Sequence, residues 1–157
     1  MSIKVIAEIG INHKGQLSRA KEIIDIAKRS GAWGIKFQYR DPSDFYASKN
    51  QIGDEILSKE INKSNLNIID ITSCAIYCKK LKLNVGISFF RTKDLIKSNR
   101  YIKNFDFIKI PSSEFNNEEL INKAIKTKRK CGTDQLVIYA AKNARTQGKE
   151  FHQVLQA

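Results

Sequence analysis

Short apolar runs alternate along this chain with segments of helical periodicity, and no other feature of the sequence restricts its fold as strongly. This alternation is the pattern of successive βα units, whose strands lie side by side in a parallel sheet. It predicts strands at residues 3–9, 35–40, 85–90 and 105–110, and the apolar run 136–139 is a candidate fifth strand. A closed (β/α)8 barrel needs eight such units and typically about 250 residues. The 157 residues therefore predict either a small open α/β sheet or a barrel cut near its middle.

The segments between these strands predict helices. Residues 18–29 carry apolar side chains at three- and four-residue steps, and residues 92–99 predict a short helix. Asn116, with Glu119 three residues later, predicts the start of another helix through a capping box. The helix before the third strand is predicted to bury a stripe formed by Ile68, Ile71, Ala75 and Cys78. The polar loop from 41 to 65 is longer than a simple connector, so we expect it to be functional.

The pattern of the chain changes near residue 130. Residues 143–157 show no convincing period and little amphipathicity. We therefore divide the chain into residues 1–130, which carry the βα units, and an aberrant tail at 131–157 that contains the candidate fifth strand. A shifted reading frame from about Lys130 onward would explain this change, and comparing the encoding DNA in all three frames would test that hypothesis.

The chain is strongly basic, with 28 Lys and Arg against 16 Asp and Glu and a net charge of +12. The densest basic run, 126–130, lies at the carboxyl end of a predicted helix, where the helix dipole favours cations. The other basic residues are scattered and form no RNA- or DNA-binding motif, so we expect no nucleic-acid partner. No apolar run approaches the roughly 18–20 residues of a membrane span. Because Glu8 interrupts the stretch that a signal peptide keeps apolar, we expect a cytoplasmic protein without a membrane partner.

Three cysteines and two histidines give little basis for a disulfide framework or a metal site. Cys74 and Cys78 lie four residues apart on one predicted helix, where a zinc pair and two packed thiols are the alternatives. No third and fourth ligand accompanies them, which favours packed thiols. His13 is a base by composition, but its position in a turn-rich loop favours a role in shaping that loop or lining a site mouth.

Ionisable side chains interrupt three of the predicted strands toward their carboxyl ends, although strands buried on both faces should be nearly all apolar. Because successive strand residues point to opposite faces, Lys36 and Gln38 face away from Ile35 and Phe37. The same alternation sets Glu8 and Lys109 on that second face. Ser88 adds a hydroxyl at the end of the third strand, and the fourth strand is followed directly by Ser112, Ser113 and Glu114.

In a barrel this second face is the interior, and the carboxyl ends of the strands form the mouth where such folds place their chemistry. Two lysines, a carboxylate and several hydroxyls at that mouth suit a small, multiply charged anion, with phosphate plus carboxylate as the obvious candidate. The alternative is that Lys36 and Lys109 extend from an exposed sheet face and form structural ion pairs with Glu8 or Glu114. Two lysines on separate strands near the same end favour the anion site.

Three segments resemble, in order and separation, motifs of the sialic acid synthase (N-acetylneuraminate synthase) family. Residues 6–15 (IAEIGINHKG) resemble its opening motif, Lys36-Phe37-Gln38 its second-strand motif, and residues 109–114 (KIPSSE) its fourth-strand motif. The resemblance covers about residues 3–126. It implies a partial (β/α)8 TIM barrel of about four to five βα units, so that residues 1–130 are the amino-terminal half of a sialic-acid-synthase-like barrel.

The resemblance also implies an activity. Family members are transferases that condense phosphoenolpyruvate with an N-acetylated hexosamine or a related sugar, release phosphate and form nonulosonic 2-keto acids. They use a divalent metal of the Mn or Mg type. By resemblance Glu8 would be the catalytic residue, because a carboxylate beside the reacting carbons assists formation or collapse of a tetrahedral intermediate. The substrate-binding residues would be, for phosphoenolpyruvate, Lys36, Lys109 and Ser112, and, for the acceptor sugar, Gln38, Ser88 and Glu114.

Some parts of the family pattern are missing from this chain. The metal-binding histidines of the family lie on later strands, so we assign no metal ligand here. The phosphate-contacting Ser-Thr-Gly turn that ends the fifth strand of the family has Ala140-Ala141-Lys142 as its nearest match, which lacks the hydroxyls. Four or five strands leave two unpaired edges, so we expect self-association or a homo-oligomer. Two functions therefore remain open: a synthase completed by another chain, or a non-catalytic remnant that retains at most an anion-binding half-site.

Overall fold

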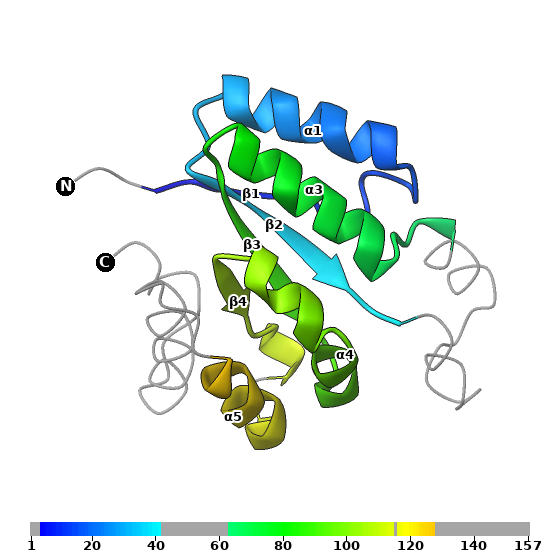
Figure 1. Cartoon of the computed structure of the whole chain (residues 1–157), viewed down its shortest axis with the longest axis vertical. Helices are drawn as coiled ribbons and strands as arrows, with labels where there is room; N and C mark the ends of the chain where they lie inside the picture. The colour runs from blue at the N-terminus through cyan, green and yellow to red at the C-terminus, as the bar shows by residue number, and fades with distance from the viewer. Residues whose placement is uncertain (1–3, 42–62, 115, 128–157) are drawn as a thin grey trace.

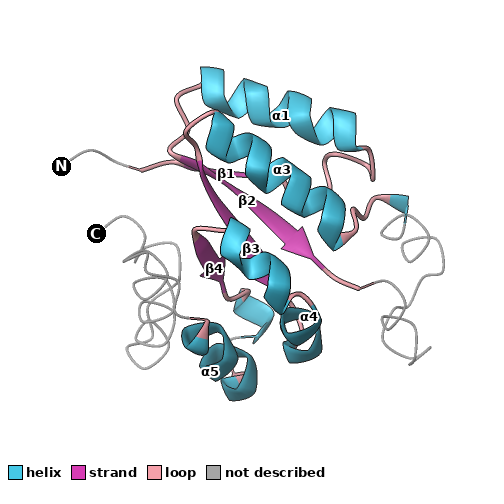
Figure 2. Cartoon of the chain, viewed as in Figure 1, coloured by secondary structure: helices cyan, strands magenta, loops and turns pink. Residues whose placement is uncertain are grey.

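The computed structural model describes residues 4–41, 63–114 and 116–127. Its strands are β1 (Ile6–Glu8), β2 (Gly34–Tyr39), β3 (Asn84–Phe89) and β4 (Phe107–Lys109). Its helices are α1 (Leu17–Arg29), α3 (Ile68–Lys80), α4 (Thr92–Lys97) and α5 (Glu118–Lys126), with 3-10 helices η2 (Asn99–Asn104) and η3 (Ser112–Glu114). The strands form one parallel sheet in the order β1-β2-β3-β4, as Figures 1 and 2 show, which confirms the predicted α/β fold with about four βα units.

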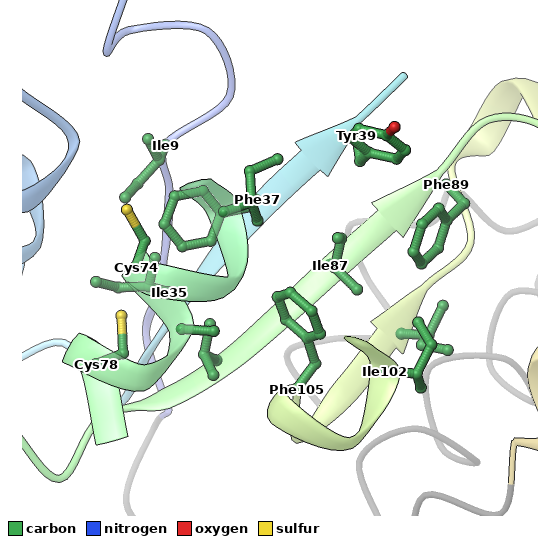
Figure 3. Close-up of a cluster of buried hydrophobic side chains, with 14 of the residues drawn as sticks. Ile9, Ile35, Phe37, Tyr39, Cys74, Cys78, Ile87, Phe89, Ile102 and Phe105 are labelled. Carbon is green, nitrogen blue, oxygen red and sulfur yellow. The ribbon is translucent and has the colours of Figure 1, made fainter. Parts of the chain in front are cut away.

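One face of the sheet is covered by helices. Helices α1 and α3 pack against each other across this face, and α3 also contacts β2 and β3 (Figure 1). The side chains beneath them come from alternate positions of the two central strands, and Figure 3 shows most of these side chains in one cluster with Cys74, Cys78, Ile102 and Phe105. They are Ile35, Phe37, Tyr39, Val85, Ile87 and Phe89, and all are buried. The alternation predicted from the sequence is therefore confirmed for β2, and β3 follows the same pattern.

The opposite face, called the inner face from here on, has an aromatic floor toward the amino ends of the strands. Gly86 pairs with Phe107 across β3 and β4, and a Cβ atom added at Gly86 would lie 2.1 Å from Cε2 of Phe107. The Phe107 ring stacks on Trp33, with ring centroids 6.2 Å apart. Glycine at position 86 therefore leaves room for the aromatic ring. Glu8 and Lys36 lie in the same row as Gly86 and Phe107, and Gln38, Ser88 and Lys109 form the next row toward the carboxyl ends of the strands.

The buried stripe predicted for α3 is confirmed, whereas the start predicted for α5 is wrong by one residue. Ile71, Ala75 and Cys78 of α3 are buried as expected, and Cys74 joins them. The start of α5 was placed one residue too early, because Asn117 and not Asn116 is the cap. The side chain of Asn117 accepts a hydrogen bond from the backbone N–H of Leu120 at 3.0 Å. The candidate fifth strand, the tail at 131–157 and most of the 41–65 loop lie outside the described residues.

Residues 4–41, 63–114 and 116–127 contain neither a membrane-spanning helix nor a metal-binding cluster. No helix there combines the length and the apolar composition that a bilayer crossing needs. No three His, Cys, Asp or Glu side chains gather there in a group that could hold a metal ion.

The thiols of Cys74 and Cys78 are expected to react slowly in the native protein. Burial raises the pKa of Cys74 to about 11 and that of Cys78 to about 12, from an ordinary value of 9.0. Because the thiolate is the reacting species, a Cys131→Ser chain should be alkylated at pH 7 at least about 100-fold more slowly when native than when unfolded in urea. Quenched time courses read by mass spectrometry would measure both rates, and equal rates would contradict the packed-thiol assignment.

Candidate functional site

The strand register brings five of the predicted site residues to the inner face. Glu8 of β1 pairs directly with Lys36 of β2. Two residues further along β2, Gln38 pairs with Ser88 of β3, and Ser88 in turn pairs with Lys109 of β4. Residues paired across a parallel sheet point to the same side, and residues two apart in one strand share a face. The five side chains therefore form two adjacent rows at the carboxyl end of the sheet.

Lys36 is the centre of this cluster. Its Nζ forms an ion pair with Oε2 of Glu8 and donates a hydrogen bond to Oγ of Ser88 at 3.2 Å. The side chain of Lys36 is only 7% exposed, whereas that of Glu8 is 48% exposed. Glu8 also accepts a longer hydrogen bond from Nε2 of Gln38, at 3.4 Å. A buried ammonium is thus held in place by a carboxylate and a hydroxyl, with the carboxylate facing solvent.

Lys109 adds a second positive charge to the same face. Burial lowers its pKa from the ordinary value, the charge of Lys36 lowers it further, and Glu8 opposes both effects. The pKa of Lys109 is therefore set by its burial and by the charges of two residues of the inner-face cluster. The two ammonium groups thus repel each other on this face, and a bound anion would relieve that repulsion.

These contacts bear on the two alternatives left by the sequence. The pair between Lys36 and Glu8 is the one that the structural alternative predicts. That alternative, however, has Lys36 extending from an exposed face, and the side chain is buried. An ammonium group has three N–H donors, and Glu8 and Ser88 account for two of those of Lys36. The described contacts thus leave this buried cation a donor for a ligand.

The residues after β4 lie at the same edge of the sheet. Glu114 ends η3, and its Oε2 accepts a hydrogen bond from Nδ2 of Asn117 at 3.0 Å. Its charge also acts on Arg40, at the end of β2. Ser113 is exposed, and Ser112 begins η3 with its side chain outside the described part. Glu114 thus lies beyond the carboxyl end of β4, and its described interactions are with Asn117 and Arg40 rather than with the Lys36 cluster.

The loop after β1 is shaped by His13 and Gly15. His13 is buried, burial lowers its pKa, and its Nδ1 accepts a hydrogen bond from the backbone N–H of Gly15 at 3.1 Å. Gly15 has a φ of +71°, and a Cβ atom there would lie 2.2 Å from the carbonyl oxygen of Lys63. A neutral imidazole that fixes a tight turn fits the loop-shaping role expected for His13.

Sequence reasoning missed a second group of charged residues, just beyond the ends of β2 and β3. Arg40 lies with its Cζ 3.6 Å from the centroid of the Phe90 ring. Arg91 forms two hydrogen bonds to the buried carboxylate of Asp94, at 3.0 and 3.1 Å. The signal for Arg40 was present, because it continues the two-residue period that begins with Lys36 and Gln38.

A surface groove of about 320 Å³ lies away from these residues, on the helix-covered side. It runs between α1, α3 and η2, and Lys21, Ile76, Tyr77 and Tyr101 are among its lining residues. The groove shares no residue with the inner-face cluster. Its contacts, such as the hydrogen bond from Tyr77 to Asp25 at 2.8 Å, join neighbouring helices.

A model of the NeuB family matches residues 23–133 of the chain. The N,N'-diacetyllegionaminic acid synthase of Campylobacter jejuni is 29% identical over 137 residues, which are 80% of this chain and 40% of that protein. The N-acetylneuraminate-9-phosphate synthase of Drosophila melanogaster is 33% identical over 131 residues, which are 78% of this chain and 35% of that protein. The chain thus spans well under half the length of these relatives.

Solved structures share the fold. The N-acetylneuraminic acid (sialic acid) synthetase of Leptospira borgpetersenii, in complex with citrate, gives a TM-score of 0.70 at 18% identity and covers 95% of this chain and 52% of that one. The spore coat polysaccharide biosynthesis protein spsE of Bacillus subtilis gives a TM-score of 0.59 at 23% identity, over 94% of this chain and 41% of that one. At these identities the likeness establishes the fold alone.

Proposed function

Because this chain belongs to the NeuB family, we propose that its inner face binds phosphoenolpyruvate for condensation with an N-acetylated hexosamine or a related sugar. The product would be a nonulosonic 2-keto acid, and the enzyme class would be a transferase that forms a carbon–carbon bond and releases phosphate. The observation that carries this proposal is the placement of Lys36 and Lys109 together on the inner face, at the carboxyl end of the sheet.

The two lysines would hold the charged groups of phosphoenolpyruvate. Its phosphate and its carboxylate each need a cation once water is excluded, and Lys36 and Lys109 supply two from neighbouring strands. Ser112, by family resemblance, would add a hydroxyl donor. Since Lys36 is fixed by Glu8 and Ser88 before the ligand arrives, little side-chain entropy is lost on binding.

Glu8 and Gln38 would then lie beside the reacting carbons. The enol carbon attacks the aldehyde carbon of the sugar, and the carbonyl oxygen of the aldehyde takes up a proton. Water adds to the resulting cation, and the tetrahedral intermediate expels phosphate to leave the keto group. The solvent-facing carboxylate of Glu8 is placed to accept a proton from that water, while Gln38, Ser88 and Glu114 contact the sugar.

A divalent metal is expected by family resemblance alone. The described residues form no group suited to hold one, so no step above is routed through a metal. Mn²⁺ is therefore added to the assay, because the family resemblance implies that the reaction needs a divalent metal.

The test of the proposed function is product formation by the whole chain. The protein would be mixed with phosphoenolpyruvate, N-acetylmannosamine or its 6-phosphate, and Mn²⁺, and both released phosphate and the 2-keto acid would be measured. Product in equal amounts with phosphate, absent from a Lys36→Met variant, supports the synthase. Saturable binding of phosphoenolpyruvate without turnover would support the second candidate, an anion-binding half-site, which the same lysine pair favours. The absence of both would contradict the proposal.

The affinity for phosphoenolpyruvate is expected to fall as the pH rises through the lowered pKa of Lys109, which lies below its ordinary 10.5. Binding needs the charged ammonium, so affinity declines once Lys109 loses its proton. The stability of the ligand-free chain should change in the opposite direction. Folding disfavours the protonated form of Lys109, so deprotonation removes that unfavourable contribution as the pH rises through the folded pKa.

Calorimetric titrations between pH 8 and pH 10.5, where phosphoenolpyruvate is fully ionised, would measure this decline. Lys109→Arg keeps a positive charge over the whole range and should flatten the profile. An identical decline in that variant would rule out Lys109 as the cause.

A further inference from the structure

The loop between β1 and α1, residues 10–15 and called the first loop from here on, contains a buried histidine that joins its two ends. His13 is only 2% exposed, and its Nδ1 accepts a hydrogen bond from the backbone N–H of Gly15 at 3.1 Å. The ring also forms a hydrogen bond with the backbone of Gly10, where the loop begins. Because Nδ1 is an acceptor, it carries no proton, and both ends of the loop are held by one neutral imidazole.

The first loop also supports a second segment at the same end of the sheet. A Cβ atom at Gly15 would lie 2.2 Å from the carbonyl oxygen of Lys63 and 3.5 Å from that of Asn65, so these backbones are in close contact. Nδ2 of Asn65 in turn donates a hydrogen bond to the carbonyl oxygen of Arg40, the residue after β2, at 2.7 Å. Figure 1 shows the first loop in dark blue, at the end of the sheet toward which the β2 arrow points. The hydrogen bond at Gly15 therefore holds a contact that joins three segments of this end.

Protonation of His13 is incompatible with this arrangement. A proton on Nδ1 turns the acceptor into a donor that faces the N–H donor of Gly15, and it leaves a charge in a site from which water is excluded. Burial lowers the pKa of His13 below the ordinary 6.5, and the hydrogen bond to Gly10 opposes this effect. The neutral ring therefore stabilises the closed loop fully above pH 6.5, and this contribution is lost as the pH falls from 6.5 through the lower pKa of the folded chain.

The charged side chains around the first loop do not counteract this effect. Those on the loop and on the elements beside it are Glu8, Lys14, Arg19, Lys63 and Asp70. Both acids already have partners, since Glu8 pairs with Lys36 and Asp70 accepts a hydrogen bond from Asn67 at 2.8 Å. Among the described residues, burial and the bond to Gly10 are the influences on the pKa of His13. A proton on the ring would therefore find no carboxylate to stabilise it.

We propose that His13 is an acid-sensitive latch: its neutral ring holds the first loop and residues 63–65 in place, and its protonation releases both. The latch acts on the site through β1. Glu8 lies two residues before the first loop, and the strand is held beyond it by the hydrogen bond from the Ile9 N–H to the Lys36 carbonyl oxygen, at 3.1 Å. Release of the loop loosens this end of β1 and with it the pair between Glu8 and Lys36. His13 is thus a positioning residue, and its effect on phosphoenolpyruvate rests on the proposed function.

Hydrogen exchange of the whole chain, followed by NMR at pH 7.5 and pH 5, tests the latch itself. A free imidazole of ordinary pKa is almost fully protonated at pH 5, so the population of the open loop should rise by up to about 30-fold. The protection factor of the Gly15 amide, corrected for the intrinsic pH dependence of exchange, should therefore fall about tenfold or more. The amide of Ala32, which donates to the carbonyl oxygen of Ala27 at the far end of α1, should change less than about twofold.

Two variants separate the latch from other effects of acid. Asparagine can accept a hydrogen bond from the N–H two residues further on and does not titrate in this range, so His13→Asn should keep Gly15 protected at both pH values. His152→Asn removes the other histidine of the chain and should respond to pH as the parent does.

The effect on the site is measured by calorimetric titration with phosphoenolpyruvate. The affinity of the parent is divided by that of His13→Asn at each pH, because this ratio cancels the protonation of the ligand itself. The ratio should fall at least about fivefold between pH 7.5 and pH 5, as a coupling between two linked elements typically provides.

Three results would overturn the latch: equal protection of Gly15 at the two pH values, a fall in protection that His13→Asn retains, or a fall that His152→Asn abolishes. A constant affinity ratio despite the release of Gly15 would overturn its link to the site. If Gly15 is released at pH 5 but the chain binds no phosphoenolpyruvate at either pH, the proposed function fails and the latch stands. If phosphoenolpyruvate binds and Gly15 stays protected, only the latch fails.

Discussion

Replacing Lys36 with methionine is expected to weaken phosphoenolpyruvate binding by about 100-fold or more. Lys36 is the buried cation of the inner face, and removing one partner of a buried charged contact leaves the ligand anion desolvated without compensation. Methionine keeps the length and apolar stem of the side chain, and Glu8 is exposed enough to be solvated once its partner is gone. The fold should therefore persist, and calorimetric titration would measure the affinity.

The matched control is Lys28→Met, which removes the same charge from the exposed last turn of α1. It should bind phosphoenolpyruvate with the parent affinity. Equal affinity in the Lys36 and Lys28 variants would show that the inner-face lysine does not contact the ligand, and the Lys36–Glu8 pair would then be purely structural.

Replacing Asp94 with alanine is expected to lower the free energy of unfolding by about 3 kcal/mol. The side chain of Asp94 is fully buried and receives two hydrogen bonds from Arg91, whose side chain is 24% exposed. Arg91 also donates to the carbonyl oxygen of Asp41, so the pair joins the end of β2 to the start of α4. Alanine removes the carboxylate and leaves a guanidinium group in a largely dry site. Urea denaturation would measure the loss.

Two variants make this prediction specific. Glu22→Ala removes an exposed acid from α1 and should change stability by less than about 0.5 kcal/mol. The double variant Arg91→Met with Asp94→Leu removes both charges and should recover more than half of the loss, because the desolvated cation is gone too. A loss below about 1 kcal/mol for Asp94→Ala alone would show that the buried pair is not a principal support of this edge.

The sequence predicted those parts of the fold that depend on local periodicity. Alternation along residues 35–40 set Phe37 on one face and Lys36 on the other, because successive residues of a strand point to opposite sides, and Phe37 is buried under the helices. The three-to-four period predicted α1 within one residue of its observed start. These inferences need no knowledge of which segments meet in space.

Features that depend on contacts formed only in the folded chain were harder to predict from the sequence. Asn116 and Asn117 are equally good N-caps by residue type. In the folded chain Asn117 is the N-cap, and its side chain also contacts Glu114. The pairing of Glu8 with Lys36 depends on the register of β1 against β2, which no single strand encodes. Arg40 was overlooked because it lies one residue beyond β2, and its contact with Phe90, one residue beyond β3, forms only when the two strands pair.

The central claim is that the inner-face lysines form a phosphoenolpyruvate site, and thermal melting of the whole chain with increasing phosphoenolpyruvate tests it most directly. A ligand that binds only the folded state stabilises it by about 2.7 kcal/mol at 100 times its Kd, which for a chain of this size raises Tm by about 5–10 °C. The account predicts a saturable rise of this order in the parent chain and its loss in Lys36→Met. A cooperative transition that phosphoenolpyruvate does not move, or a rise that Lys36→Met retains, would contradict it.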